Sequence, residues 1–302
     1  GIIRVGLLSE IVDVKIRLGI KMVDQVIRNG LVADPVKGTI EPKNIGIQDG
    51  KIVVISEEEL VGKKVWDAEG LIVAPGFIDI HSHVSGQDYA GLLSARQGIT
   101  TTVGGNCGGS PVDLGKFFSE QEERGFIINQ VSFIGHSTLR RELGSGDPLS
   151  SASAGQIEIM EGQVREALAA GACGISLGLA YIPGSSEEEI YRLSQIVADA
   201  DKLIAVDTRL KTPDDLDSLR EVVEISRRTG ARTQVSHFVY QYGTGVLTEA
   251  LAIIDEARAE GIDIRLDSGM YTPWTSGIQA VLFSPESLAA SSLELSDILI
   301  IT

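Results

Sequence analysis

Two histidines stand one residue apart in the stretch GFIDIHSHVSGQD, residues 76–88, although the whole chain has only four histidines. On an extended strand, residues two positions apart point to the same face, so His81 and His83 project together. Imidazole nitrogens bind zinc and similar divalent ions. The pair therefore predicts a metal site at the end of a short strand. The alternative, one strand-capping histidine beside one core histidine, is disfavoured by the preceding GFID at the first strand of an α/β series.

Other residues able to bind a metal follow later apolar stretches. Cys107 lies in GGNCGG, where glycines on both sides let the backbone approach a ligand closely. Its thiolate can bind one ion or be shared by two. His237, at the end of TQVSH, is the third good histidine ligand. Cys173, in GACGIS, is interpreted instead as a small buried thiol.

The stretch FIGHSTLRRELG offers further polar groups. His136 is interpreted as either a metal ligand or a group that positions substrate. Arg140 and Arg141 follow it and form a plausible clamp for a carboxylate, with a solvated helix face as the alternative.

Short apolar strands alternate with amphipathic helices from about residue 71 onward. One predicted helix places Ile157, Met160, Val164 and Leu168 on a single face, and another opens with a capping box in SSEEEIYRL. Such alternation predicts right-handed βαβ units around a parallel sheet. Because polar residues recur at the ends of so many strands, we predict an α/β fold of the TIM-like (β/α) barrel type, with a doubly wound sheet as the alternative.

Residues 1–70 have a different pattern, and we predict a small β-sandwich-like module there, followed by the barrel over residues 71–302. The segment 12–23 alternates apolar and polar residues as a half-buried strand does. Asn29-Gly30 and Asp49-Gly50 lie between apolar runs and predict tight hairpins.

Composition excludes several classes of function. The formal net charge of −16 argues against nucleic acid and anionic membranes as partners, since both require clustered Lys and Arg. The two cysteines are too few for a disulfide framework, and no apolar run reaches 18 residues. We therefore expect a cytoplasmic protein acting on a small molecule.

Five motifs, taken in order, resemble the amidohydrolase superfamily and most closely its D-aminoacylase branch, the N-acyl-D-amino-acid deacylases. They are APGFIDIHSHV, ARQGITTTVGGNCGGSP, GHSTLRRELG, EALAAGACGISLGLAYIPG and DSGMYTPW. The resemblance covers the chain from about residue 24 to its end. It implies a TIM-like barrel beside a small β-module, and one or two zinc ions that activate water to attack the amide of an N-acyl-D-amino acid.

The resemblance also assigns roles. The metal ligands are His81 and His83 from the first strand, Cys107 as a bridging thiolate, and His237 as a fifth-strand ligand. Tyr181 in GLAYIPG matches a substrate-contacting tyrosine. Beyond the resemblance, we expect Arg140, Arg209 and Tyr271 to bind substrate and Asp207 and His136 to be catalytic.

Three departures from the family pattern stand out. Ser85 replaces a frequent aspartate, and Asp207 stands in AVDTR where relatives read AVHTR. The sequence stops at SDILIIT, after six of eight barrel strands, before the strand that supplies a metal-binding, proton-accepting aspartate. We therefore expect a strand over 298–301, and a second polypeptide or unlisted sequence against Thr302 that completes the barrel in an oligomer.

Two other functions remain open. A cyclic amidase of the hydantoinase or dihydroorotase kind would need a bridging carbamylated lysine, and GISLGLAY contains no lysine. A degenerate amidohydrolase serving as a structural or regulatory subunit is consistent with Ser85, Asp207 and the absent aspartate.

Overall fold

The computed structural model describes residues 22–84, 86–144, 147–209, 212, 214–243, 245–269, 271 and 275–300. The chain divides into two compact units, with the boundary between Gly76 and Phe77. This boundary lies a few residues beyond the one expected at residue 70. The strand predicted over 12–23 lies outside the described residues except for its last two.

The first unit contains one five-stranded sheet in the order β3-β2-β1-β4, with β5 also paired to β1. Its strands are β1 (Val23–Asp34), β2 (Thr39–Gln48), β3 (Lys51–Ser56), β4 (Gly62–Asp67) and β5 (Ile72–Val73). β1 and β2 pair antiparallel, as do β2 and β3, whereas β4 and β5 run parallel to β1.

The two predicted hairpins have different outcomes. Asp49 and Gly50 have φ of 50° and 71° and join β2 to β3 as a two-residue turn, as predicted. The hairpin predicted at Asn29-Gly30 is wrong, because both residues lie inside β1 at a shift in its register with β2. Asn29 adopts φ of 62°, and its side-chain amide donates to Asp67 at 2.9 Å. The left-handed residue therefore makes a bulge instead of a turn.

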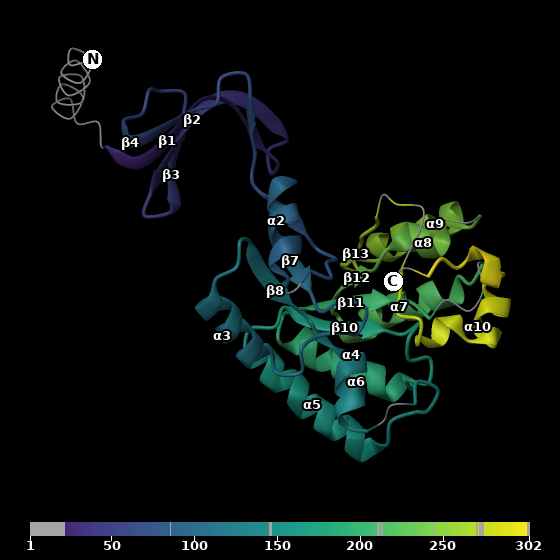
Figure 1. The fold of residues 1–302 in the computed structure, drawn as a ribbon. Coiled ribbons are helices and arrows are strands. Elements are labelled where there is room, and N and C mark those ends of the chain that lie inside the picture. Colours follow the sequence, from purple (N-terminus) through teal and green to yellow (C-terminus); the bar gives the residue numbers. More distant parts are fainter. Residues whose placement is uncertain are drawn as a thin grey trace, which may run out of the picture. The chain divides into compact units, whose positions relative to one another are not determined.

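The second unit is built on parallel strands. They are β6 (Phe77–Asp79), β7 (Ile99–Gly104), β8 (Asn129–Ser132), β9 (Ile134–Gly135), β10 (Gly174–Gly178), β11 (Leu203–Asp207), β12 (Arg232–Val235) and β13 (Ile264–Leu266). One sheet has the order β6-β7-β8 and the other the order β13-β12-β11-β10-β9 (Figure 1). Strand order follows chain order without the reversal that defines a doubly wound sheet. The predicted α/β fold is confirmed.

The number of strands corrects the sequence prediction. Only Phe133 separates β8 from β9, so these two segments occupy one position between β7 and β10. The described chain therefore has seven successive parallel positions where six were expected. One consequence concerns His237, which follows β12, the sixth position, while Asp207 ends β11, the fifth. The assignment of His237 to the fifth strand was wrong by one.

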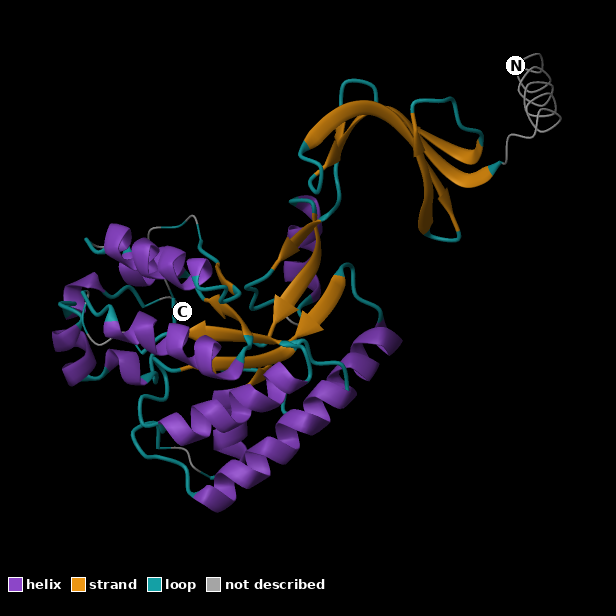
Figure 2. Ribbon diagram, turned by 180° about the vertical axis from the view of Figure 1, so that it is seen from behind, coloured by secondary structure: helices purple, strands orange, loops and turns teal. Residues whose placement is uncertain are grey.

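Helices connect these strands and pack beside them (Figure 2). The helices are α2 (Asp88–Arg96), α3 (Leu114–Arg124), α4 (His136–Glu142), α5 (Ala154–Ala169), α6 (Glu187–Asp199), α7 (Asp217–Thr229), α8 (Phe238–Tyr242) and α9 (Leu247–Ala259). A continuous apolar core joins strand residues such as Ile175, Val206 and Val235 to helix residues such as Met160 and Val222. Burial of these side chains holds the strand ends in fixed register.

The first turn of α6 departs from its sequence prediction in an informative way. Ser186 caps the helix by accepting a hydrogen bond from the Glu189 backbone, as predicted. The Glu189 carboxylate does not complete the capping box, because it bonds instead to His136 and Arg140. A residue expected to serve helix α6 thus links it to α4.

The residues after β13 form short helices, η1 (Val281–Phe283), α10 (Pro285–Ala290) and η2 (Leu295–Asp297). The strand predicted over 298–301 is not formed at residues 298–300. The predicted contact of Thr302 lies outside the described residues. No helix among the described residues is both long and apolar enough to cross a membrane.

Candidate metal and active site

The site lies at the carboxyl ends of the parallel strands in the second unit. His81 and His83 follow β6, Cys107 follows β7, Asp207 ends β11, and His237 follows β12. Because paired parallel strands end at the same edge of a sheet, residues far apart in sequence meet there.

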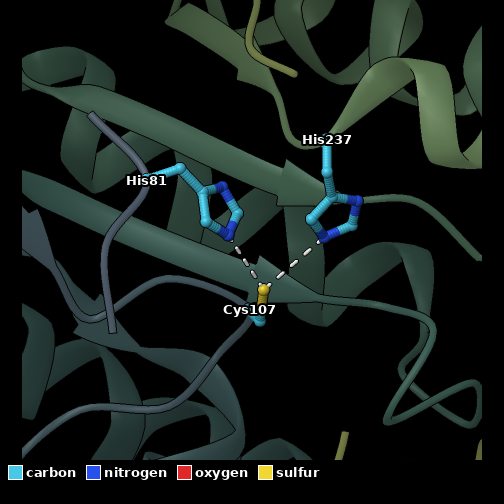
Figure 3. A group of neighbouring side chains, drawn as sticks. All are labelled: His81, Cys107 and His237. Carbon is cyan, nitrogen blue, oxygen red and sulfur yellow. Dashed lines mark hydrogen bonds between the residues drawn. The ribbon is translucent and has the colours of Figure 1, made fainter. Parts of the chain in front are cut away.

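Three of the predicted ligands converge on one point, as Figure 3 shows. The sulfur of Cys107 lies 3.3 Å from Nε2 of His81 and 3.6 Å from Nε2 of His237. The fourth predicted ligand, His83, places its Nε2 3.9 Å from the same sulfur. One potential donor atom from each of His81, Cys107 and His237 lies within 4.8 Å of the others.

These separations fit a divalent metal. Zinc–nitrogen and zinc–sulfur bonds of about 2.0–2.1 and 2.3 Å in a tetrahedral site place nitrogen and sulfur about 3.6 Å apart. The sulfur of Cys107 meets this separation for His237 and falls slightly below it for His81. Two imidazoles and one thiolate are also a donor set that zinc favours. The residues present therefore suit a zinc ion.

The loop that carries Cys107 depends on its glycines. Cys107 has φ of 54°, and Gly105 and Gly108 have φ of 76° and 77°. A Cβ on Gly105 would lie 2.2 Å from the carbonyl oxygen of Phe133. The loop between β7 and α3 can therefore approach β9 only because position 105 has no side chain.

Replacing Gly105 with alanine is expected to displace the loop and weaken metal binding. Both the backbone clash and the left-handed φ act against the substitution. Gly109→Ala is the matched control in the same loop, because its Cβ would meet nothing nearer than 3.9 Å. Isothermal titration of zinc into each folded variant measures the effect. Equal zinc affinity in the two variants would contradict this account of the loop.

Two buried carboxylates border the ligands in different ways. Asp207 Oδ2 lies 3.5 Å from His237 Nε2, the same atom that faces Cys107. Asp267 lies behind His81, with Oδ2 3.3 Å from Nδ1 of the ring, opposite the Nε2 that faces Cys107. Asp267 Oδ1 also accepts a 2.6 Å hydrogen bond from the backbone of His237.

The charges around the ligand cluster favour a bound cation. Burial first, and then the charges of Asp207 and Asp267, raise the pKa of the Cys107 thiol. Burial lowers the pKa of His83, assisted by His81 and His237. A thiolate beside the carboxylates of Asp207 and Asp267 is unfavourable by itself, whereas a divalent ion would stabilise it.

Two predicted substrate-binding arginines bind other groups of the protein. Arg140 is 1% exposed and pairs with both carboxylate oxygens of Glu189 at 2.8 and 2.9 Å. Arg209 donates from Nε to Glu221 and from its two terminal nitrogens to the carbonyl oxygens of Pro183 and Ser185. Neither guanidinium has two neighbouring N–H groups free to bind a substrate carboxylate through a pair of parallel hydrogen bonds.

His136 is also not brought into the ligand cluster. Its ring is fully buried, and Nε2 lies 2.7 Å from Oε1 of Glu189. The geometry gives it a structural contact in place of the predicted catalytic or metal-binding one.

The two predicted tyrosines differ in setting. Tyr181 is half-buried, and its hydroxyl accepts a hydrogen bond from Ser276 at 3.3 Å. Burial, aided by the charge of Asp207, raises the pKa of Tyr181 to about 12. Tyr271 is 74% exposed, and its backbone nitrogen donates to the Tyr240 hydroxyl.

Asp267 is the residue whose role the sequence did not reveal. It stands in RLDSG directly after an apolar strand, so its place at the strand ends was visible from the sequence. Its partner His81 lies 186 residues earlier, and no spacing rule links the two.

Similar proteins support the expectation drawn from the motifs. The model of the Amidohydrolase family matches residues 64–128. The N-acyl-D-glutamate deacylase of Alcaligenes xylosoxydans xylosoxydans is 34% identical over 274 residues, which cover 81% of this chain and 56% of the relative. This chain thus spans little more than half the length of that relative.

Solved structures of two deacylases are also similar to this chain. An N-acyl-D-glutamate deacylase from Bordetella bronchiseptica, complexed with zinc and a phosphonate inhibitor, has a TM-score of 0.76 at 30% identity over 83% of this chain and 59% of its own. A D-aminoacylase structure described by its binuclear metal centre has a TM-score of 0.72 at 26% identity, over 82% and 59% of the two chains. Together these similarities confirm the predicted resemblance to the D-aminoacylase branch of the amidohydrolase superfamily.

Proposed function

Given this resemblance to the D-aminoacylase branch of the amidohydrolase superfamily, we propose that the chain is the metal-binding part of a hydrolase that cleaves the amide bond of N-acyl-D-amino acids. The observation that carries the proposal is the convergence of His81, Cys107 and His237 at the carboxyl ends of parallel strands. The sequential strand order supports the further proposal that these strands form the arc of a (β/α) barrel.

In this proposal one or two zinc ions are held by the ligand cluster, with His83 at its margin. Bound zinc would supply the Lewis acidity that polarises an amide carbonyl and lowers the pKa of water. The donor atoms are positioned by their strands, because His81, Cys107 and His237 each lie within three residues of the carboxyl end of a parallel strand.

Asp207 is assigned as the proton acceptor for the attacking water. Its side chain is only 4% exposed, and Oδ1 is held by a 2.8 Å hydrogen bond from the Gln241 amide. That bond leaves Oδ2 on the side of His237 and Cys107, where a water molecule would react. A fixed carboxylate in a dry setting can accept a proton from water and deliver it to the leaving nitrogen.

Tyr181 is assigned to substrate binding. A phenol whose pKa is raised to about 12 keeps its proton at neutral pH and can donate a hydrogen bond to a substrate oxygen. The geometry of Arg140 and Arg209 does not support the same role, and Tyr271 stays a prediction.

The direct test is hydrolysis of N-acetyl-D-glutamate by the full protein that contains these 302 residues, measured as release of the free amine. We expect activity with zinc, loss of activity after chelation, and little activity toward the L enantiomer. Asp207→Asn should lower kcat by about 10²–10⁴-fold with little change in KM.

Asp201→Asn is the matched control for that variant, because Asp201 precedes the same strand and its side chain is 92% exposed. It should leave kcat unchanged. Folded, zinc-loaded protein that releases no amine from any N-acyl-D-amino acid tested would overturn the proposed function.

A further inference from the structure

We infer that Asp267 is a positioning residue that fixes the tautomer of His81 and the place of His237, and so sets the affinity of the site for its metal. The inference rests on the proposed function for the identity of the ligand. The side chain of Asp267 is 8% exposed, so its hydrogen bonds form with little competition from water.

The three donors around Asp267 come from two parts of the fold, His81 after β6 and the pair Gln234 and His237 at the end of β12. Oδ2 faces Nδ1 of His81 and accepts from the Gln234 amide, and Oδ1 accepts from the His237 backbone. One carboxylate, directly after β13, thus ties the segment after β6 to the turn after β12. Loss of the carboxylate would release both histidine-bearing segments together.

The bond to His81 has a chemical consequence. A carboxylate can only accept, so the proton of the neutral ring must sit on Nδ1. Nε2 then carries the lone pair, and Nε2 is the atom that lies 3.3 Å from Cys107. A carboxylate behind a histidine ligand fixes the ring orientation and raises its basicity toward the metal.

Among the described histidines of the cluster, this arrangement is particular to His81. The carboxylate beside His237 is Asp207, which lies at Nε2, on the same side as Cys107. Asp207 therefore borders the metal position itself, whereas Asp267 acts from behind a ligand. The two buried carboxylates are predicted to give different phenotypes when replaced.

The test is D267N, which keeps the size of the side chain but can accept through only one oxygen. We expect that oxygen to stay with the backbone N–H of His237, because the Gln234 amide can turn its own oxygen toward the new amide nitrogen whereas a backbone N–H can only donate. The amide nitrogen then faces Nδ1 of His81 and favours the opposite tautomer, with the proton on Nε2. We expect zinc affinity to fall by about 10–100-fold.

Two measurements separate this inference from the proposed function. Nitrogen-15 NMR of the histidine rings in metal-free protein, at a pH where they are neutral, reports the tautomer without any metal. The parent should show His81 protonated on Nδ1 and D267N should show it protonated on Nε2. Zinc competition with a chelator then reports affinity, and Asp263→Asn is the control, since Asp263 pairs with the exposed Arg265 on the same strand.

The outcomes are distinct. A parent protein with His81 protonated on Nε2 overturns the inference even if D267N does not fold. Unchanged zinc affinity in a folded D267N variant also overturns it. A parent that shows the expected tautomer but binds no zinc contradicts the proposed function instead, and leaves the tautomer role of Asp267 supported.

Discussion

Cys107→Ser is expected to lower zinc affinity by at least about 100-fold and to remove the proposed amidohydrolase activity. Losing a direct ligand should cost at least as much as losing a group behind one, for which 10–100-fold is typical. Serine preserves the size of the side chain, but its hydroxyl does not ionise to replace a thiolate. Zinc content after dialysis, measured by atomic emission on folded protein, gives the result directly.

Cys173→Ser is the matched control, since Cys173 is the only other cysteine of the chain. Burial raises the pKa of the Cys173 thiol to about 12, and this residue is not a member of the ligand cluster. The control should retain zinc and activity. If both variants lose zinc equally, Cys107 is not the ligand proposed here.

The metal-binding residues could be predicted because their signal is local. His81 and His83 are two residues apart just after one short strand, and Cys107 and His237 each follow a short segment, ITTTV and ARTQV, that the alternation of strands and helices predicts to be a parallel strand. Parallel strands of one sheet end at a common edge, so local positions were enough to predict proximity. The structure brings His81, Cys107 and His237 within reach of one ion.

The charged residues could not be predicted in the same way, because their roles depend on partners distant in sequence. Arg140 and Arg209 looked available for substrate in the sequence. In the fold, Glu189 lies 49 residues after Arg140 and neutralises it, and Glu221 pairs with Arg209. Asp267 shows the reverse case, a residue without a predicted role whose contact with His81 gives it one.

A turn-forming dipeptide produced a hairpin only where the flanking residues paired with each other across it. Asp49-Gly50 makes a hairpin because Gln48 pairs with Lys51, and Ile47 with Ile52, directly on either side of it. Asn29-Gly30 has equally suitable residues, yet β1 pairs with β2 both before and after it. The same left-handed preference therefore produces a bulge, and the choice between the two depends on strand pairing that the dipeptide does not encode.

Glu189→Gln is expected to destabilise the protein by about 3–5 kcal/mol, the usual cost of breaking a buried ion pair by removing one partner. The Glu189 and Arg140 side chains are 0% and 1% exposed and lie 2.8 Å apart. The glutamine amide would leave the guanidinium charge buried without compensation. It would also lose one of the acceptors now shared between Arg140 and His136. Urea denaturation followed by circular dichroism measures the change.

Glu188→Gln tests whether burial is the cause, because Glu188 precedes Glu189 on α6 and pairs with Arg192 while 66% exposed. The loss of the Glu188 carboxylate should cost no more than about 0.5 kcal/mol of stability.

Burial alone would raise the pKa of Glu189, but His136 and Arg140 hold it below the ordinary value of 4.5. The stabilisation from Glu189 is therefore complete above about pH 4.5 and is lost as the pH falls through the lower folded-state pKa. The difference between parent and Glu189→Gln should shrink over that acidic range, and a difference independent of pH would show that the carboxylate charge is not its source.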